Sequence, residues 1–323
     1  MFAIMGTLQD SPMRSSYLKH NKPRLCFIKG LEKLVQLLRW VYMRALKNKY
    51  KTLYRPGHFY SPIPSIEELR RNKDYLYVPS QDGIDLNAAH QVALLDTFRK
   101  YYAEIPVDGQ PAGGSRYNYD NDYFRYADGV ILYSFLRHLS PKHIIEVGSG
   151  NSTMLMLDVN EKFFDNRIRM TVIDPYPECL LSRLSPGDHK LLEIHEKPVQ
   201  ALGIDLFGEL QGGDILFIDS SHVGKSGSDV LHYLFRIFPK LRAGVFIHLH
   251  DMFYPFEYPF EWLELGRAWN ELYLVRAFLV GNHDYQIEYF NDYMGRQQPA
   301  LLEAKLPLCR RDTGSSLWLQ KLR

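Results

Sequence analysis

Short apolar runs alternate with amphipathic stretches along the second half of the chain. The runs have the length of strands and are apolar at nearly every position, which is typical of parallel strands buried on both faces. This alternation predicts an α/β fold with a doubly wound, mostly parallel sheet and helices on both faces. The expected strands are 143–147, 170–174, 191–195, 214–219, 244–249, 285–290 and 315–320, with a helix at about 262–280 before the last two.

The first half of the chain contains helical patterns and no strand pattern. Helices are expected at 31–49, 65–72, 86–102 and 122–139. We therefore predict three parts: a basic, partly helical extension (1–55), a helical region on the substrate side (56–139) and the sheet domain (140–323). In the helix at 31–49, apolar residues recur every three or four positions. Such a face can pack on its own domain, on a second copy of the chain or on anionic lipid.

Charge is unevenly distributed along the 323 residues. The chain carries +2 overall, but residues 1–55 hold 12 Lys or Arg and two acids, so this segment is +10 and the remainder about −8. The small total argues against a dedicated nucleic-acid binder, whereas a basic end suits an acidic partner or a membrane surface. Three scattered cysteines indicate no disulfide framework. With neither a signal-peptide pattern nor a long apolar run, we expect a cytoplasmic protein with possible peripheral membrane contact.

The most informative stretch is Glu146-Val147-Gly148-Ser149-Gly150, at the end of the first expected strand. A Gly-x-Gly turn followed by Ser and Thr leads from a buried strand into a helix. Glycines allow close backbone approach to a ligand, and the free N–H groups at a helix start favour an anion. The stretch indicates a nucleotide-type cofactor site.

The type of cofactor follows from the neighbouring residues. Asp174 ends the second strand, where an acid can accept hydrogen bonds from both ribose hydroxyls of an adenosine. The NAD fingerprint needs a third glycine three positions after Gly150, and that position is Thr153. An acid ahead of the glycines, Glu146, suits a cofactor that bears an amine. Together these features favour S-adenosylmethionine over NAD.

Acids and histidines follow the fourth and fifth strands. Asp219 ends one strand with His222 three residues later, and the next strand ends in His250-Asp251. These side chains are expected to meet at the edge of the sheet that carries the glycine turn. They can remove a hydroxyl proton, or they can hold a divalent metal: Mg²⁺ for aspartates alone, and Mn²⁺, Fe²⁺ or Zn²⁺ where histidine takes part. Either histidine can instead serve only as a supporting or capping group.

Two aromatic segments are candidates for an acceptor pocket. Residues 116–126 contain four tyrosines and two aspartates, and residues 252–262 are rich in aromatic residues and proline. Aromatic faces suit sugars and planar rings. Both segments can equally be coverings of the core.

At these residues the chain resembles the class I S-adenosylmethionine-dependent methyltransferases, and among them the bacterial branch that includes macrocin-type O-methyltransferases. The resemblance spans about residues 140–320 and is carried by 146–150, 218–222 and 250–251. It implies a seven-stranded sheet with one reversed strand.

The resemblance also implies roles for single residues. Glu146, Gly148, Ser149 and Gly150 would bind the methionine part of the cofactor, Asp174 the ribose and Gln200 the adenine. Asp219, His250 and Asp251 match positions that hold Mg²⁺ in metal-dependent relatives, although relatives often have an oxygen ligand where this chain has His250.

We therefore expect methyl transfer to a hydroxyl of a sugar or another small metabolite. His222, His250 and Asp219 are the expected catalytic residues, and a homo-oligomer is the expected state. Two alternatives remain open: a catalytically silent binding or scaffold protein on the same fold, and a metal-dependent hydrolase that uses the Asp/His cluster.

Overall fold

The computed structural model describes residues 31–41, 54–79, 83–106, 109 and 114–323. The chain divides into two units, residues 1–70 and 71–323. The first contains a helix over residues 31–41, in line with the periodicity, while the rest of the predicted helix (42–49) lies outside the described residues. The predicted three-part division at residues 55 and 139 stays a prediction. Within the described part of the chain, we find no helix with the length and apolarity needed to cross a membrane.

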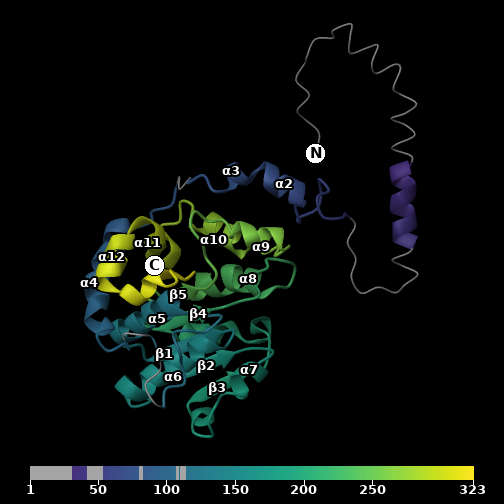
Figure 1. Cartoon of the computed structure of the whole chain (residues 1–323). Helices are drawn as coiled ribbons and strands as arrows, with labels where there is room; N and C mark the ends of the chain where they lie inside the picture. The colour runs from purple at the N-terminus through teal and green to yellow at the C-terminus, as the bar shows by residue number, and fades with distance from the viewer. Residues whose placement is uncertain (1–30, 42–53, 80–82, 107–108, 110–113) are drawn as a thin grey trace. The chain divides into compact units, whose positions relative to one another are not determined.

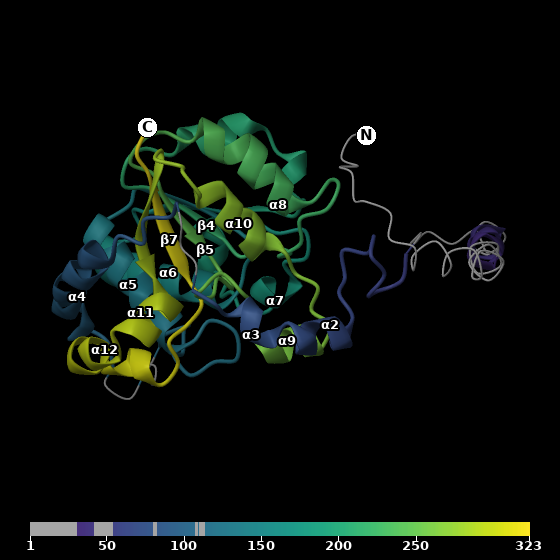
Figure 2. The same cartoon turned by 90° about the horizontal axis from the view of Figure 1, so that it is seen from above.

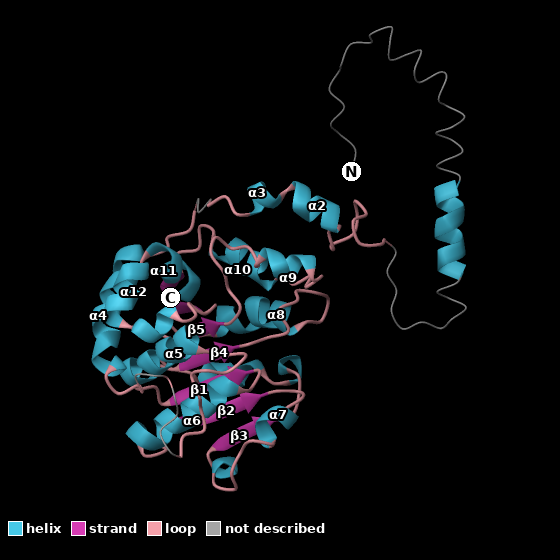
Figure 3. Cartoon of the chain, viewed as in Figure 1, coloured by secondary structure: helices cyan, strands magenta, loops and turns pink. Residues whose placement is uncertain are grey.

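The second unit is built around one seven-stranded sheet in the order β3-β2-β1-β4-β5-β7-β6. All seven predicted strands form, within three residues of the predicted bounds. β7 is antiparallel to both neighbours, and β1 to β5 pair in parallel, so the sheet has one reversed strand. Figure 3 shows the strands in magenta between the helices. The strands are β1 (His143–Val147), β2 (Arg169–Ile173), β3 (Leu192–His195), β4 (Ile215–Ile218), β5 (Phe246–Leu249), β6 (Tyr285–Phe290) and β7 (Leu317–Lys321).

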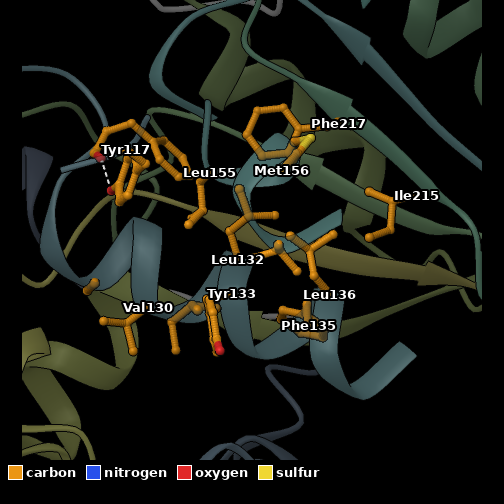
Figure 4. Packing of buried hydrophobic residues seen from close by; sticks show 14 of the residues in the cluster. Tyr117, Val130, Leu132, Tyr133, Phe135, Leu136, Leu155, Met156, Ile215 and Phe217 are labelled. Atoms are coloured by element: carbon orange, nitrogen blue, oxygen red, sulfur yellow. Dashed lines mark hydrogen bonds between the residues drawn. The ribbon is translucent and has the colours of Figure 1, made fainter. Parts of the chain in front are cut away.

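Helices cover both faces of the sheet because successive strand residues point to opposite sides. On one face, Ile144 and Ile215 pack with α4 (Ala88–Tyr102), α5 (Tyr126–Leu139) and α6 (Asn151–Phe164). Figure 4 shows Ile215 with residues of α5 and α6. On the other face, Ile145 and Leu216 pack with the region from α8 (Asp229–His232) to α10 (Glu271–Leu279). Figures 1 and 2 show these two helical layers from different sides. The predicted fold class is confirmed.

The order of strands decides where the active groups lie. β1 is flanked by β2 on one side and β4 on the other, and the connections to those neighbours run in opposite directions along the sheet. Ligands bind at such a switch point, beyond the carboxyl ends of the strands. The ends of β1, β2, β4 and β5 therefore place the glycine turn, Asp174, Asp219 and His250-Asp251 at one edge.

Two helical predictions need correction, and two further helices were not predicted. The helix predicted from 122 begins at Tyr126, because the Asn121 side chain accepts hydrogen bonds from the backbone N–H groups of Tyr123 and Phe124 and forms a turn there. The helix predicted at 262–280 is broken into α9 (Phe260–Glu264) and α10, with Gly266 at φ 82° between them. Two helices between β6 and β7 were not predicted, α11 (Asn291–Gln297) and α12 (Pro299–Lys305).

The shorter elements connect these parts. They are α2 (Ile66–Arg71), α3 (Lys73–Leu76), α7 (Glu178–Leu181), the 3-10 turns η1 (Asp188–Lys190), η2 (Val199–Ala201), η3 (Ile204–Glu209), η5 (Phe238–Lys240) and η6 (Pro307–Arg310), and a π-helical turn, η4 (Tyr233–Ile237).

Candidate active site

The glycine turn follows β1 and has two glycines in different surroundings. Gly148 lies at φ 81°, in the left-handed region, and a Cβ added there would collide with the backbone carbonyl oxygen of Asp219 at the end of β4. Gly150 has an extended backbone (φ 171°), and a Cβ added there would meet no atom within 4 Å. Gly148 is therefore required by the packing of the protein itself, whereas Gly150 leaves open space beside the turn.

Glu146 is buried under the turn, with 1% of its surface exposed. Its two carboxylate oxygens accept hydrogen bonds from Ser152 Oγ and Thr153 Oγ1, each at 2.6 Å. Thr153 Oγ1 also accepts from the backbone N–H of Gly150 at 3.1 Å. Burial raises the pKa of Glu146 to about 8 in spite of these donors. Glu146 thus fastens the end of β1 to the start of α6, a role that the sequence did not reveal.

Asp174, directly after β2, contacts the same turn. Its Oδ2 accepts from Ser149 N at 3.1 Å and Ser149 Oγ at 2.6 Å, and its Oδ1 accepts from Tyr176 N at 2.8 Å. The side chain is half-buried, so a ligand can reach it. The hydroxyl of Ser149 occupies the acceptor that a ribose hydroxyl would use.

Gln200 lies on η2, after β3. Its Nε2 donates to the carbonyl oxygen of Gly227 at 2.8 Å, in the segment that follows β4. Its Oε1 is buried and has no hydrogen-bond partner in the protein. A buried acceptor without a partner is costly, so this oxygen is suited to an N–H donor of a ligand.

A tight group of charges surrounds His222. Its Nε2 lies 3.3 Å from Asp219 Oδ1 and 3.5 Å from Asp251 Oδ2, and its Nδ1 lies 2.8 Å from Glu271 Oε2. Glu271, the first residue of α10, is almost fully buried and also accepts from Ser220 Oγ at 2.9 Å. The structure brings Asp219, His222 and Asp251 together as predicted. It adds Glu271, which no sequence pattern indicated because it lies 49 residues after His222.

The charges in this group support one another. Burial by itself would lower the pKa of His222, but the carboxylates of Asp219 and Glu271 outweigh that effect and raise it to about 11. Close packing would raise the pKa of Asp219, but His250 and His222 lower it below its usual value. Asp219 and the imidazole are thus stabilised in their charged forms. Asp219 keeps 41% of its side chain exposed, the largest exposure in the group.

His250 lies beside this group and is buried, with Phe124 packed at 5.3 Å between ring centroids. Its Nε2 is 3.9 Å from Asp251 Oδ1, too far for a hydrogen bond, and its Nδ1 has no partner among the described residues. Burial by itself would lower the pKa of His250, but nearby carboxylates, Asp251 first, raise it. His250 therefore keeps one ring nitrogen, Nδ1, that no described residue holds.

Asp128 on α5 is linked to Asp251 by hydrogen bonds through Ser315. Its Oδ1 accepts from Ser316 Oγ (2.6 Å), Asn291 Nδ2 (2.9 Å) and Ser315 N (3.0 Å). Ser315 Oγ in turn donates to Asp251 Oδ1 at 3.1 Å. His248 Nε2 bonds Ser316 Oγ at 2.8 Å, and the ring stacks on Phe217 with centroids 3.8 Å apart, so His248 is part of the packing. Sequence reasoning missed Asp128, because an acid on an apolar helix has no local signature.

Comparison with known proteins agrees with this geometry. The sequence matches the profile of a family described as "Methyltransferase domain" over residues 145–252, which contain the glycine turn, Asp174, Asp219 and His250-Asp251. An uncharacterized protein of Archaeoglobus fulgidus is 33% identical over 165 residues, which cover 49% of this chain and 74% of that protein. The chain belongs to the class I S-adenosylmethionine-dependent methyltransferases. The narrower macrocin-type branch stays a prediction.

Solved structures of methyltransferases are similar to this chain only distantly. The O-methyltransferase TomG of Streptomyces achromogenes, in complex with SAM, is 12% identical and covers 71% of this chain and 89% of its own, at a TM-score of 0.39. An SAH-bound methyltransferase of Podospora anserina is 15% identical and covers 81% of this chain and 99% of its own, at a TM-score of 0.40. Identities this low carry no information about the substrate.

The cofactor-side residues of this methyltransferase fit an adenosyl ligand. Gly150 leaves open space, Asp174 is reachable at the end of β2, and Gln200 has an unpaired buried oxygen that can accept from an adenine amino group. Glu146 is buried and each of its oxygens already accepts from a hydroxyl, so its pairing with the cofactor's amine stays a prediction.

The proposed metal ligands fit a metal poorly. Among the residues that the structure describes, no three or more His, Cys, Asp or Glu side chains are arranged to hold an ion. The carboxylates of Asp219 and Asp251 instead face Nε2 of His222, and His250 is nearly 4 Å from Asp251. The metal assignment of Asp219, His250 and Asp251 stays a prediction that this arrangement does not favour.

The two aromatic segments of the methyltransferase serve mainly as packing. In the loop after Asp251, Tyr254, Phe256 and Tyr258 are buried in the core of the α8–α10 face. In the segment 116–126, Tyr117 and Tyr119 are buried, while Tyr123 is 82% exposed. Edge-to-face contacts join Phe253, Trp262 and Trp269 beside His222. An acceptor wall is thus limited to the partly exposed members of each segment.

Proposed function

We propose that this methyltransferase transfers a methyl group to a hydroxyl of a small molecule, a sugar or a similar polyhydroxylated metabolite. One observation carries the proposal: the open space at Gly150 and the Asp219 carboxylate lie at the same edge of the sheet. Gly148, two residues before Gly150, closely approaches the backbone of Asp219. A donor and an acceptor bound there would be adjacent.

S-adenosylmethionine would bind to residues after β1, β2 and β3 that can accept hydrogen bonds or that leave open space. Asp174 would accept from the ribose hydroxyls after Ser149 releases it, and Gln200 Oε1 would accept from the adenine. Gly148 and Gly150 let the backbone come close to the methionine part. The cofactor supplies a methyl group on a sulfonium sulfur, which leaves as a neutral thioether when the acceptor oxygen takes the methyl.

The acid–histidine cluster would act on the acceptor. Asp219, the most exposed carboxylate of the group, would accept a hydrogen bond from a hydroxyl next to the reacting one and so orient the acceptor. His250 would take the proton of the reacting hydroxyl, because both ring nitrogens of His222 already face carboxylates. Alignment of the reacting atoms should supply most of the rate gain.

The basic N-terminal segment suggests where the enzyme works. In the helix over 31–41, six aliphatic side chains each expose 48–59% of their surface: Leu31, Leu34, Val35, Leu37, Leu38 and Val41. An apolar helix face within a segment of charge +10 suits the surface of an anionic membrane. We propose peripheral contact of this helix with anionic lipid; self-association stays a prediction.

Calorimetric titration of the full-length protein with S-adenosylmethionine and S-adenosylhomocysteine tests the proposal first. Gly150→Leu should abolish binding, because its side chain would fill the open space. Gly203→Leu is a matched control, since Gly203 is exposed, has an ordinary backbone (φ −67°) and has no atom within 4 Å of an added Cβ.

An acceptor screen with methyl-labelled cofactor follows on wild type and His250→Gln. Label on a hydroxyl compound that His250→Gln no longer methylates would support the assigned base. Failure of the wild type to bind either cofactor form would refute the function, and cofactor binding without transfer to any hydroxyl acceptor would favour the scaffold alternative.

A further inference from the structure

An arginine lies against the aromatic side chains beside His222. The guanidinium carbon of Arg267 is 4.2 Å from the ring centroid of Trp262 and 5.1 Å from that of Trp269. The two indole rings meet edge to face, with centroids 5.4 Å apart, and Trp269 packs against the imidazole of His222 at 4.3 Å. A single indole ring therefore separates this cation from the acid–histidine cluster.

The break between α9 and α10 holds Arg267 in this place. Gly266 lies at φ 82° after the end of α9, and the N–H of Arg267 donates back to the carbonyl oxygen of Trp262 at 3.0 Å. Three residues later, the N–H of Asn270 donates to the carbonyl oxygen of His222 at 3.1 Å. The loop is thus fastened at one end to α9 and at the other end to the segment that follows β4.

The N–H donors of Arg267 remain available to a ligand. The residue is exposed, and its guanidinium forms no hydrogen bond or ion pair with any residue that the structure describes. A guanidinium that stacks on an aromatic ring makes that contact with its flat face, so its donors still point outward in the plane of the group. These donors form a fixed fork that matches the oxygens of a carboxylate or a phosphate.

The charges around the acceptor end explain why a cation is needed for an acidic ligand. Asp219, Asp251 and Glu271 make this end acidic, and the Asp219 side chain is 41% exposed. A neutral sugar can bind beside these carboxylates without a cation, whereas an acidic molecule is repelled by them. An acidic acceptor therefore needs a positive group that holds its charge away from Asp219, and Arg267 lies at a suitable place.

We propose that the acceptor is itself acidic, a polyhydroxylated molecule that carries a carboxylate or a phosphate, and that Arg267 binds this charged group. The acceptor would lie against the partly exposed indoles of Trp262 and Trp269, with its hydroxyls toward Asp219. The identity of the bound molecule as a methyl acceptor rests on the proposed function. The anion site itself depends only on Arg267 and the two indoles.

The binding of three sugars tests this on the full-length protein, with and without S-adenosylhomocysteine: D-glucuronate, D-glucose 6-phosphate and neutral D-glucose. Calorimetry at constant ionic strength gives the affinities. Tryptophan fluorescence gives a second signal, because two of the four tryptophans lie against the guanidinium. At least one acid should bind about tenfold tighter than glucose or more, and the acid that does so identifies the charged group. No preference for either acid over glucose would overturn the proposal.

Variants assign the preference to a residue. Arg267→Gln should bind the preferred acid about as weakly as glucose, and Arg267→Lys, which keeps the charge but lacks the planar fork, should retain only part of the preference. Arg99→Gln is the matched control, since Arg99 is an exposed arginine on α4, which covers the opposite face of the sheet. A preference that survives Arg267→Gln in a protein folded by circular dichroism, or one that Arg99→Gln removes equally, would overturn the role of Arg267.

Titration of wild type with S-adenosylmethionine separates this proposal from the proposed function. Binding of an acidic sugar through Arg267 without any binding of the cofactor would overturn the methyltransferase function and leave the anion site in place. Binding of the cofactor without a preference for an acidic sugar would overturn the acidic acceptor and leave methyl transfer to a neutral hydroxyl compound.

Discussion

Replacement of Gly148 by alanine should destabilise the protein and disturb Asp219 together with it. The residue lies at φ 81°, and an alanine there pays about 1–2 kcal/mol for the left-handed conformation. The added methyl group would also collide with the carbonyl oxygen of Asp219, so the end of β1 must shift away from β4. Overpacking of this kind costs about 1–3 kcal/mol. We expect a total loss of roughly 2–5 kcal/mol in unfolding free energy.

The assay is thermal and urea unfolding of wild type, Gly148→Ala and Gly150→Ala, followed by calorimetry with S-adenosylmethionine. At roughly 2–4 °C per kcal/mol for a domain of this size, the loss in Gly148→Ala should lower Tm clearly. Gly150→Ala is the matched control two residues away: its methyl group meets open space, so it should cost under about 1 kcal/mol, the range for alanine at a helix N-cap.

The two variants should therefore differ in which property they lose. Gly148→Ala loses stability, and Gly150→Ala keeps stability but binds the cofactor less tightly, because the methyl group narrows the space that the ligand needs. A Gly148→Ala protein with the wild-type Tm would refute the packing argument. Unchanged cofactor affinity in Gly150→Ala would refute the placement of the ligand beside this turn.

Three further predictions concern other parts of the molecule. The pKa of Glu146 is raised from 4.5 to about 8, so between these pH values the folded state binds a proton that the unfolded state has lost. In urea unfolding, wild type should therefore lose stability relative to Glu146→Gln as pH rises from about 4.5 through 8. Parallel pH profiles of the two proteins would contradict this. Asp128→Ala leaves the donors of Asn291, Ser315 and Ser316 without their acceptor and should lower the unfolding free energy by about 2–5 kcal/mol. Asp128→Asn keeps an oxygen there and should lower it less. Equal urea midpoints for the two variants and wild type would show that the three bonds contribute little. In the helix over 31–41, Leu38→Glu should weaken co-sedimentation with phosphatidylserine vesicles more than Gln36→Glu does. Gln36→Glu is the control, because it adds the same charge on the polar side of the helix. Equal weakening by both variants would contradict insertion of the apolar face.

Local patterns were sufficient for the sheet and for one side of the site. Parallel strands buried on both faces are continuous apolar runs, so all seven were visible in the sequence, and the Gly-x-Gly turn marked the cofactor edge. Asp219 and Asp251 could be placed together because parallel strands end at a common edge. The break between α9 and α10 was missed because apolar residues continue across it; the structure uses that break to bring Trp269, Asn270 and Glu271 against His222.

The sequence by itself determined the fold class, the family and the edge of the sheet where chemistry is placed, since these depend on residues close together in the chain. The tertiary structure decided which groups are free to act. Glu146 is occupied by Ser152 and Thr153, and His222 is enclosed by three acids, one of them 49 residues away. Asp128 reaches Ser316 from 188 residues away. The physical reason is that hydrogen-bond capacity and net charge at a buried site depend on every neighbour in space, and no local pattern specifies those neighbours.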